Sequence, residues 1–221
     1  MQTIARQQVE SAYRLHFSAQ TPTRVTSVIK RIVWAAVAAT LLACSESTAP
    51  DGVPDPQLNI VLQDTLAPPL VVTRDSFWAK VGDGRDLRMD YVGGEEFLRF
   101  EVPGDGLLRK PDGSAFQPGD SILITITVQD PARFLFDFTP AGLQFSPDHP
   151  ARLRVEYSHS EHDFNGDGAE DSLDVEIEQE LDLWYRAAPG ALWFKMGAVK
   201  FENLEEIDAN IFSFSQYAVA W

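Results

Sequence analysis

Alternation of apolar and polar residues constrains this chain more than any other feature of its sequence. In SILITITV, residues 121–128, every second position is a branched aliphatic residue: Ile122, Ile124, Ile126 and Val128. The same period of two runs through EFLRFEV, RFLFDF and RLRVEY, at 96–102, 133–138 and 152–157. Because successive side chains of a strand point to opposite faces, this period predicts strands with one buried face.

The longest alternating run is LDVEIEQELDLWY, residues 173–185. Its glutamates favour a helix by composition, but a helix would carry them round onto its own apolar side. The alternation therefore predicts a strand over 173–185, with Leu173, Val175, Ile177, Leu181, Leu183 and Tyr185 on the buried face.

Turn signals separate the alternating runs, among them GDG at 82, PGDG at 103 and QPGD at 117. Short alternating strands at this spacing are typical of a β-sandwich. Before them, the Ser- and Pro-rich SESTAPDGVPDPQ (45–57) and Pro68-Pro69 are typical of a flexible spacer. We expect an all-β chain with a single antiparallel β-sandwich over 74–221, after a signal peptide (1–43) and a flexible linker (44–73).

Composition narrows the possible functions. Hydrophobic residues make up 44% of the 221, enough for a core, and the formal net charge is −15. Such an acidic chain repels phosphate backbones, so nucleic acid is not expected as a partner. The sequence contains no G-x-S-x-G, no H-E-x-x-H and no P-loop, and we expect a protein that is not an enzyme. A glycosidase, which needs only two placed carboxylates, stays open as an alternative.

The uncharged run IVWAAVAATLLA, residues 32–43, follows Lys30 and Arg31 and precedes small and polar residues. A basic segment, a short apolar run and then small residues predict a secretory signal peptide over 1–43. The run is shorter than the roughly 20 residues of a membrane span. The segment before the lysine is long for a signal peptide, so we expect translation to start near Val25.

The end of this run, Leu41-Leu42-Ala43-Cys44, resembles the lipobox of bacterial lipoproteins. The resemblance implies cleavage before Cys44, the only cysteine, and its acylation with diacylglycerol and a further chain such as palmitate. Several acyl chains would anchor the protein firmly to a membrane. Because Ser45 rather than aspartate follows Cys44, the resemblance implies the outer membrane of the cell envelope, on its periplasmic or surface face.

Two segments of the second half resemble the ZU-five type of β-sandwich domain. In FTPAGLQFSPDHPARLRVEYS and FSFSQYAVAW, the matching positions are Pro140, Gly142, Leu143, Phe145, Pro150, Tyr157, Phe214, Ser215, Tyr217, Ala218 and Val219. The resemblance implies a β-sandwich fold. One branch of that family cuts itself between the Phe and Ser of the closing motif, here Phe214 and Ser215. The histidine that often precedes this pair is Ser213 in this chain, so a closing strand is the favoured interpretation and self-cleavage the alternative.

The most specific chemical signal is DFNGDGAEDSLD, residues 163–174. Counted from Asp163, oxygen-bearing residues recur at positions 1, 3, 5, 9 and 12, with glycine at 6. This is the calcium-loop pattern of EF-hands, in which position 7 contributes a backbone carbonyl. The loop resembles dockerin loops in having Asp at position 12. We predict a structural Ca²⁺ held by Asp163, Asn165, Asp167, Ala169, Asp171 and Asp174, in a β-hairpin connection between two strands.

The charge around this loop allows other interpretations. Residues 161–182 contain ten acidic side chains and no Lys or Arg. A divalent cation would relieve their repulsion, but a solvated acidic turn is the alternative. The pair His159 and His162 beside Asp163 suggests a transition metal only if a rigid frame supplies a further ligand.

These features predict a lipid-anchored extracytoplasmic protein whose sandwich is a binding or structural module for a protein or carbohydrate ligand at the cell surface. Carbohydrate binding is the main alternative. It would require an exposed strip of aromatic side chains, for which the candidates are Trp78, Trp184, Trp193 and Trp221; packing in the core is the other role for these residues.

Overall fold

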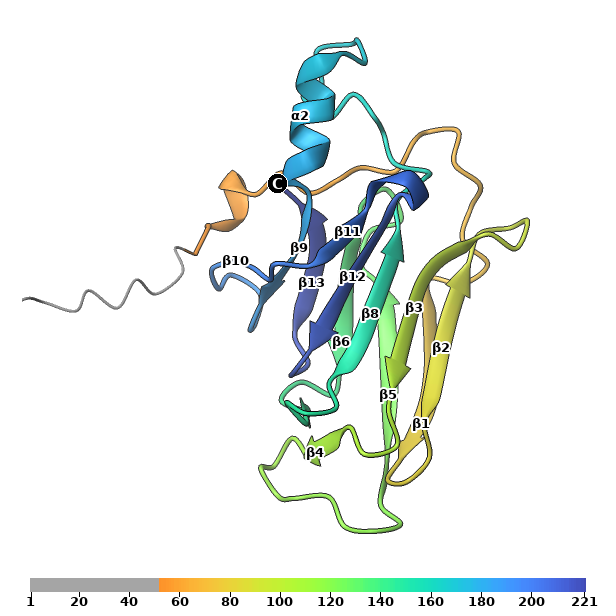
Figure 1. Cartoon of the computed structure of the whole chain (residues 1–221), viewed down its shortest axis with the longest axis vertical. Helices are drawn as coiled ribbons and strands as arrows, with labels where there is room; N and C mark the ends of the chain where they lie inside the picture. Colours follow the sequence, from red (N-terminus) through yellow and green to blue (C-terminus); the bar gives the residue numbers. More distant parts are fainter. Residues whose placement is uncertain (1–51) are drawn as a thin grey trace, which may run out of the picture. The chain divides into compact units, whose positions relative to one another are not determined.

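A computed structural model describes residues 52–221 and shows two antiparallel sheets packed face to face (Figure 1). The six-stranded sheet has the order β1-β5-β6-β13-β9-β10, and the five-stranded sheet has the order β11-β12-β8-β3-β2. The expected all-β antiparallel sandwich is confirmed. The strands of the first sheet are β1 (Arg74–Lys80), β5 (Ser121–Val128), β6 (Leu135–Thr139), β13 (Gln216–Ala220), β9 (Asp182–Arg186) and β10 (Phe194–Lys195).

The strands of the second sheet are β11 (Val199–Phe201), β12 (Glu206–Ile211), β8 (Ala151–Glu156), β3 (Glu96–Val102) and β2 (Arg85–Asp90). A small separate pair consists of β4 (Leu107–Arg109) and β7 (Gln144–Phe145). The described residues also include two short 3-10 helices, η1 (Asp55–Gln57) and η2 (Glu202–Leu204), and one α-helix that is described below.

Apart from the run 173–185, the alternating runs form the strands that were predicted from them. The run 121–128 is β5, in which Ile124, Ile126 and Val128 are buried as expected. The runs 96–102 and 152–157 correspond to the neighbouring strands β3 and β8, which bring Phe100 opposite Leu153. One face of each strand therefore faces the opposite sheet, as a period of two requires.

Aromatic side chains fill the space between the two sheets. Phe100 of the five-stranded sheet contacts Phe138 edge-on, with ring centroids 5.2 Å apart, and Phe214 lies 5.4 Å from Phe138. Tyr217 extends this cluster at 5.1 Å from Phe138. Edge-on and tilted arrangements of this kind add to the stabilisation from buried area. The closing motif FSFSQYAVAW therefore contributes to the core.

Part of the segment expected to be a linker packs against the sandwich. Val61 is completely buried in the main core, and Val53 pairs with Trp193. Trp193 donates its indole N–H to Asp55, which also forms an ion pair with Arg186 at 2.6 Å. From residue 53 onward the expectation of a flexible linker does not hold. Val61 fills the main core, and Val53 and Leu58 pack with Trp193 in a second small core on the outer face of the six-stranded sheet.

The N-terminal predictions fall outside the described residues. The signal peptide 1–43, the start near Val25 and the lipid site Cys44 all lie in this part of the chain. Within residues 52–221, the helices lack the length and hydropathy needed to cross a membrane.

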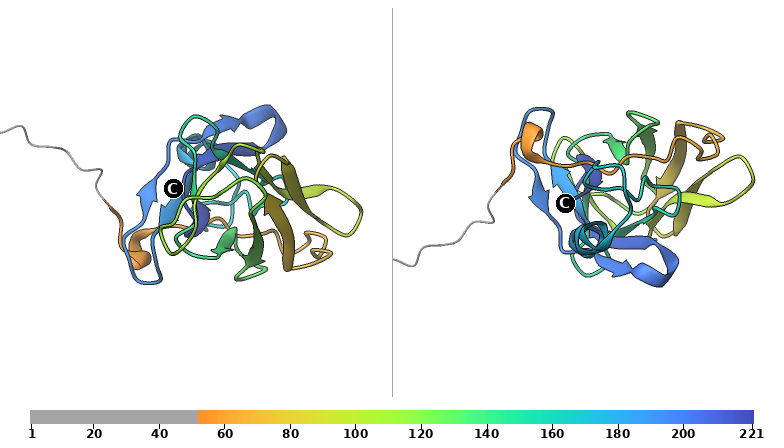
Figure 2. Two further views of the ribbon diagram at one scale, coloured as in Figure 1. Left: turned by 90° about the horizontal axis from the view of Figure 1, so that it is seen from below. Right: turned by 90° about the horizontal axis from the view of Figure 1, so that it is seen from above.

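The strand predicted over 173–185 is wrong in its first part. Residues Ser172–Glu180 form a helix, α2, and β9 begins only at Asp182. Asp171 and Asp174 form a reciprocal capping box at the start of α2, which satisfies backbone N–H groups that a helix leaves free. The helix projects from one end of the sandwich and is seen end-on in the view from above (Figures 1 and 2).

Candidate metal centre

The loop 163–174 connects β8 of one sheet to α2, and β9 of the other sheet follows. The predicted hairpin connection is therefore wrong. Counted from Asp163, the helix begins at Ser172, which is position 10 of the loop. β8 ends at Glu156, and turns and irregular chain fill residues 157–162 before the loop. The loop thus has an exiting helix in the manner of an EF-hand but no entering one.

The carboxylate of Asp163 organises the first half of the loop. Its Oδ1 accepts hydrogen bonds from the backbone N–H groups of Gly166 (2.9 Å) and Asp167 (3.1 Å), and its Oδ2 accepts from Gly168 (2.7 Å). Gly166 and Gly168 have φ angles of +72° and +91°, in the left-handed region that glycine adopts readily. These two glycines let the backbone curl around the aspartate.

The carboxylate of Asp174 closes the second half of the loop. Its two oxygens accept from the backbone N–H groups of Asn165 (3.1 Å) and Asp171 (2.9 Å). Asp174 is 4% exposed and is the only buried residue of α2. These backbone donors, that of Asp171 first, hold the pKa of the Asp174 carboxyl below its usual range.

The predicted ligands are joined in one hydrogen-bond network. Beyond the bonds of Asp163 and Asp174, Asn165 Oδ1 accepts from Asp167 (2.8 Å) and Asp167 Oδ1 accepts from Ala169 (3.0 Å). Asp171 caps the helix through Leu173. The side-chain oxygens of the loop thus face the loop's own amides, and in residues 52–221 no three His, Cys, Asp or Glu side chains form a group that could hold a metal ion.

The chemistry of the donors still fits a hard cation. An ionised carboxylate has about four lone-pair sites, so an oxygen that accepts one amide retains capacity for a cation. The predicted set also includes the Asn165 amide and the Ala169 carbonyl, which are oxygen donors of other types. Calcium takes six to eight oxygens of such mixed kinds. The order of donors and the position of the helix are compatible with Ca²⁺.

The two histidines near the loop contact different acidic residues. His159 contacts Glu95 (2.6 Å) and His162 contacts Glu205 (3.8 Å). The structure therefore does not bring His159, His162 and Asp163 together as a transition-metal site.

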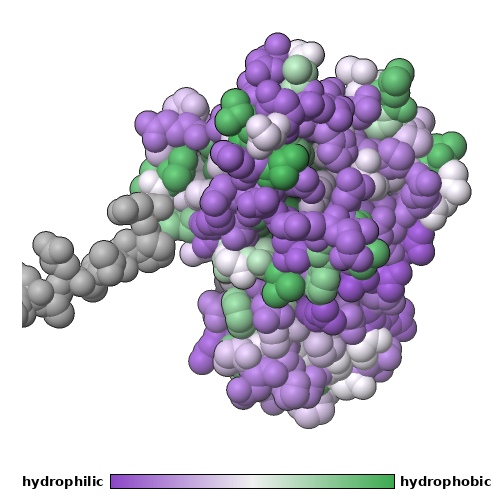
Figure 3. All heavy atoms as spheres, turned by 45° about the horizontal axis from the view of Figure 1, so that its top comes forward, coloured by the Kyte–Doolittle hydropathy of each residue, from purple (hydrophilic) through white to green (hydrophobic). Residues whose placement is uncertain are grey.

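The surface around α2 is strongly polar. The face in Figure 3, on which the α2 end of the molecule is turned forward, is mostly hydrophilic, and its hydrophobic side chains form small separate groups. Leu173 and Val175 of α2 are exposed apolar residues, at 53% and 54% exposure. Ile177 of α2 packs against the main core, and Glu178 accepts a hydrogen bond from the Tyr157 hydroxyl (3.0 Å). The helix otherwise buries little apolar surface, so its two ends contribute much of its stability.

The residues considered for self-cleavage are in the core. Phe214 and Ser215 are buried, and the one hydrogen bond that the Ser215 hydroxyl donates in the described structure goes to the Gln216 carbonyl at 3.5 Å. The third histidine of this region, His149, contacts Asp105. The described contacts thus pair each of the three histidines with an acid and give Ser215 no histidine base.

The candidate tryptophans do not form a strip. Trp184 and Trp193 are buried in the small second core, and Trp221 packs against the main core. Trp78 is 57% exposed and lies opposite the exposed Leu123. A single exposed indole is not the aromatic platform that the carbohydrate alternative requires.

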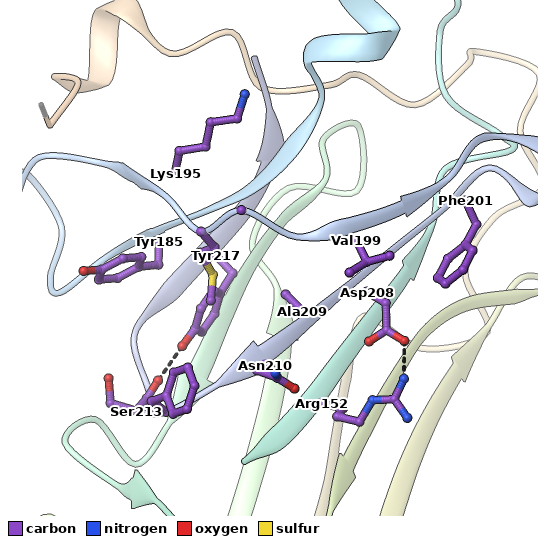
Figure 4. A pocket seen from close by; sticks show the side chains of 13 residues that line it. Arg152, Tyr185, Lys195, Val199, Phe201, Asp208, Ala209, Asn210, Ser213 and Tyr217 are labelled. Carbon is purple, nitrogen blue, oxygen red and sulfur yellow. Dashed lines mark hydrogen bonds and ion pairs between the residues drawn. The ribbon is translucent and has the colours of Figure 1, made fainter. Parts of the chain in front are cut away.

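Sequence reasoning missed a cavity of about 600 Å³ between the two sheets (Figure 4). It is lined by residues of β9, β12 and β13 and of the connection between β10 and β11, including Tyr185, Met196, Ala209 and Tyr217. No motif marks these residues, because they come together only through the pairing of distant strands.

Comparisons with known proteins give no relative. No family model matches the chain, and neither a curated protein nor a solved structure matches it.

Proposed function

We propose that this chain is an extracytoplasmic β-sandwich that acts as a binding or structural module, attached to the envelope membrane by lipid on Cys44, with Ca²⁺ in the loop 163–174 fastening α2. One observation carries the metal part of this proposal. The helix begins at position 10 of the loop, and its buried Asp174, at position 12, reaches back to Asn165 at position 3.

The proposed ion has a structural role because the body of α2 is held by few described contacts, chiefly those of Ile177 and Glu178. Isolated helices shorter than about 12–15 residues are marginal in water, and this helix has nine residues. At its C-terminal end, Lys195 and Lys200 donate to the carbonyls of Glu180 and Glu178. At its N-terminal end, the described attachment is the loop 163–174 itself, and a cation there would also offset the repulsion among the loop's carboxylates.

The experiment is a thermal melt of the full chain, in detergent, with excess Ca²⁺ and with chelator. Binding to the folded state alone adds about 2.7 kcal/mol at a ligand concentration of 100 Kd. For a domain of this size, that corresponds to a rise in Tm of about 5–10 °C. The rise is expected to disappear in the double variant Asp163→Ala/Asp167→Ala.

The matched control is Asp112→Ala. Asp112 accepts from Ser114 in a Pro-Asp-Gly turn, but that turn lacks the spacing of the calcium pattern. This variant should keep the full response to Ca²⁺. Equal melts with Ca²⁺ and with chelator at millimolar concentration would make the loop an acidic turn and remove the metal from the proposal.

A further inference from the structure

The pairing of β11 with β12 stops before β12 ends. Val199 lies opposite Asp208, so the next rung of the ladder would set Gly197 opposite Asn210. Instead, Gly197 and Ala198 donate their N–H groups to the carboxylate of Asp182, at 3.2 and 2.8 Å. The chain turns away there, with a φ of +70° at Gly197. Among the described strands, none pairs with the last three residues of β12 on this side.

The backbone groups left without a strand partner on this side are those of Asn210. Tyr157 donates its N–H to the Glu205 carbonyl (2.7 Å), which places the backbone groups of the odd-numbered residues of β12 towards β8. In an antiparallel ladder these groups alternate in direction along the strand. The N–H and C=O of Asn210 therefore face the open edge, where water reaches this exposed residue.

The cavity described above lies directly beside this edge. Figure 4 shows β12 diverging from the chain that leads through β10 to β11, with Tyr217 and Ala209 between them. Its volume of about 600 Å³ is within the range of about 300–1,000 Å³ that is typical of ligand sites. Phe212, 50% exposed, lies at the same cavity. An open strand edge and an aromatic cavity thus occur together.

We propose that this edge binds an extended peptide segment of a partner protein, which adds as a strand antiparallel to β12. The peptide exchanges two backbone hydrogen bonds with Asn210 and takes the place that the chain vacates at Gly197. Binding of this kind combines main-chain hydrogen bonds with pockets for alternate side chains. A sugar or a small apolar molecule could fill the cavity, but neither would complete the ladder.

The register of the sheet specifies the side chains of the peptide. Ala209 and Ile211 are buried and face inward, so peptide residues opposite them point towards the cavity. The residue opposite Asn210 lies on the outer face, where Arg152 is the partner of Asn210 across β8. The Arg152 side chain is 52% exposed and contacts Asp208 at 2.5 Å.

The charge on this outer face favours an acidic residue at the central position. Arg99 and Arg154 lie opposite each other on neighbouring strands, next to Arg152. Arg99 and Arg154 are already paired with Glu96 and Glu206. Arg152, whose described ion pair is with Asp208 and whose side chain is half-exposed, is therefore the cation available to the central position of the peptide. The site therefore fits an extended segment with the pattern apolar–acidic–apolar.

This inference deepens the proposed binding role, but it requires neither Ca²⁺ nor the lipid on Cys44. A flat calcium melt would leave it intact, and a failed peptide titration would leave the calcium site intact. The probe is the peptide Thr-Val-Glu-Val-Thr-amide with fluorescein on its N-terminal amine. It is titrated against the full chain in detergent, and binding is followed by fluorescence anisotropy. Saturable binding is expected by about 1 mM, as suits a short added strand.

Two N-methylated peptides test the strand geometry. Methylation of the central Glu nitrogen removes the hydrogen bond to Asn210 and should weaken binding about tenfold. Methylation of a flanking Val nitrogen, which points away from β12, should change binding less than about twofold. Absence of binding by the parent peptide up to about 1 mM would overturn the proposal. Equal binding of all three peptides would also overturn it, because it would indicate that side chains alone occupy the cavity.

A charge test identifies the central position. Replacing the peptide Glu by Lys should weaken binding about 2–5-fold, the effect of an exposed ion pair. The variant Arg152→Gln should abolish this preference. The matched control Arg88→Gln, on the far edge strand of the same sheet, should retain it. Retention of the preference in Arg152→Gln would refute the assigned register.

Discussion

Replacement of Asp182 by alanine tests how the two sheets are joined. Asp182 opens β9 in the six-stranded sheet and is 6% exposed. Its carboxylate accepts the N–H groups of Gly197 and Ala198, two of the three residues that carry the chain from β10 to β11 in the other sheet. Burial is the first influence on this carboxyl and raises its pKa above the usual range, although the amides of Ala198 and Gly197 act in the opposite direction.

The expected cost follows from the groups left behind. Asp182→Ala leaves two backbone N–H groups without their acceptor, and each unsatisfied buried group costs about 1–3 kcal/mol. Water at the neighbouring cavity can reach part of this connection, so we expect a loss of about 2–4 kcal/mol rather than the full sum. For a domain of this size, the loss corresponds to a fall in Tm of about 5–15 °C.

Urea unfolding followed by circular dichroism measures this loss, with an m value equal to that of the wild type. The matched control is Asp130→Ala, because Asp130 also accepts a backbone N–H, that of Ala132, but in an exposed turn. The control should lose less than about 1 kcal/mol. Equal losses in the two variants would show that the hydrogen bonds of Asp182 to Gly197 and Ala198 do not join the sheets.

Further expectations concern three other positions. The pKa of Glu156 is raised, first by burial and then by Glu96 and Glu206. The folded state therefore loses stability as pH rises through this pKa. In thermal melts across pH, Glu156→Gln should raise Tm by about 1–3 °C at pH 7 but leave it unchanged near pH 3. Trp193 is completely buried, so Trp193→Ala should cost about 3–5 kcal/mol in urea unfolding, and a smaller loss would contradict the role of the second core. Cys44→Ser should abolish incorporation of a labelled fatty acid in cells, and labelling that persists would refute lipidation at this cysteine.

The sequence predicted the sandwich well because strand burial is a local pattern. The run 121–128 became β5 with its branched residues inward, since a strand that covers a core must alternate. The polar outer face of the five-stranded sheet could also be anticipated from this alternation. The order of the strands in the two sheets could not, because it depends on contacts between residues far apart in the chain.

The helix α2 shows where alternation misleads. Leu173 and Val175 alternate with acids as if in a strand, yet both are exposed. The true signal was the pair Asp171 and Asp174 at the spacing of a capping box, which overrides a weak apolar pattern. The alternation predicts burial correctly again at Leu181, just before β9, and at Leu183, within β9.

The candidate sites differ in the same way. The loop 163–174 is contiguous, so its donors could be named from spacing, and the structure joins them in one network. The open edge at Asn210 could not be named, because it exists only where Asp182 draws Gly197 out of register. Such a site depends on residues about 15 to 30 positions apart that share no motif.

The basic residues explain why the loop region is left without an internal counter-charge. Lys195 and Lys200 donate hydrogen bonds to carbonyls at the C-terminal end of α2, where cations interact favourably with the helix dipole. Arg186 forms an ion pair with Asp55. Within the described residues, neither a lysine nor an arginine forms an ion pair with a carboxylate of the loop 163–174. The fold thus holds the C-terminal end of the helix with its own cations, and the proposed Ca²⁺ would supply the counter-charge at the N-terminal end.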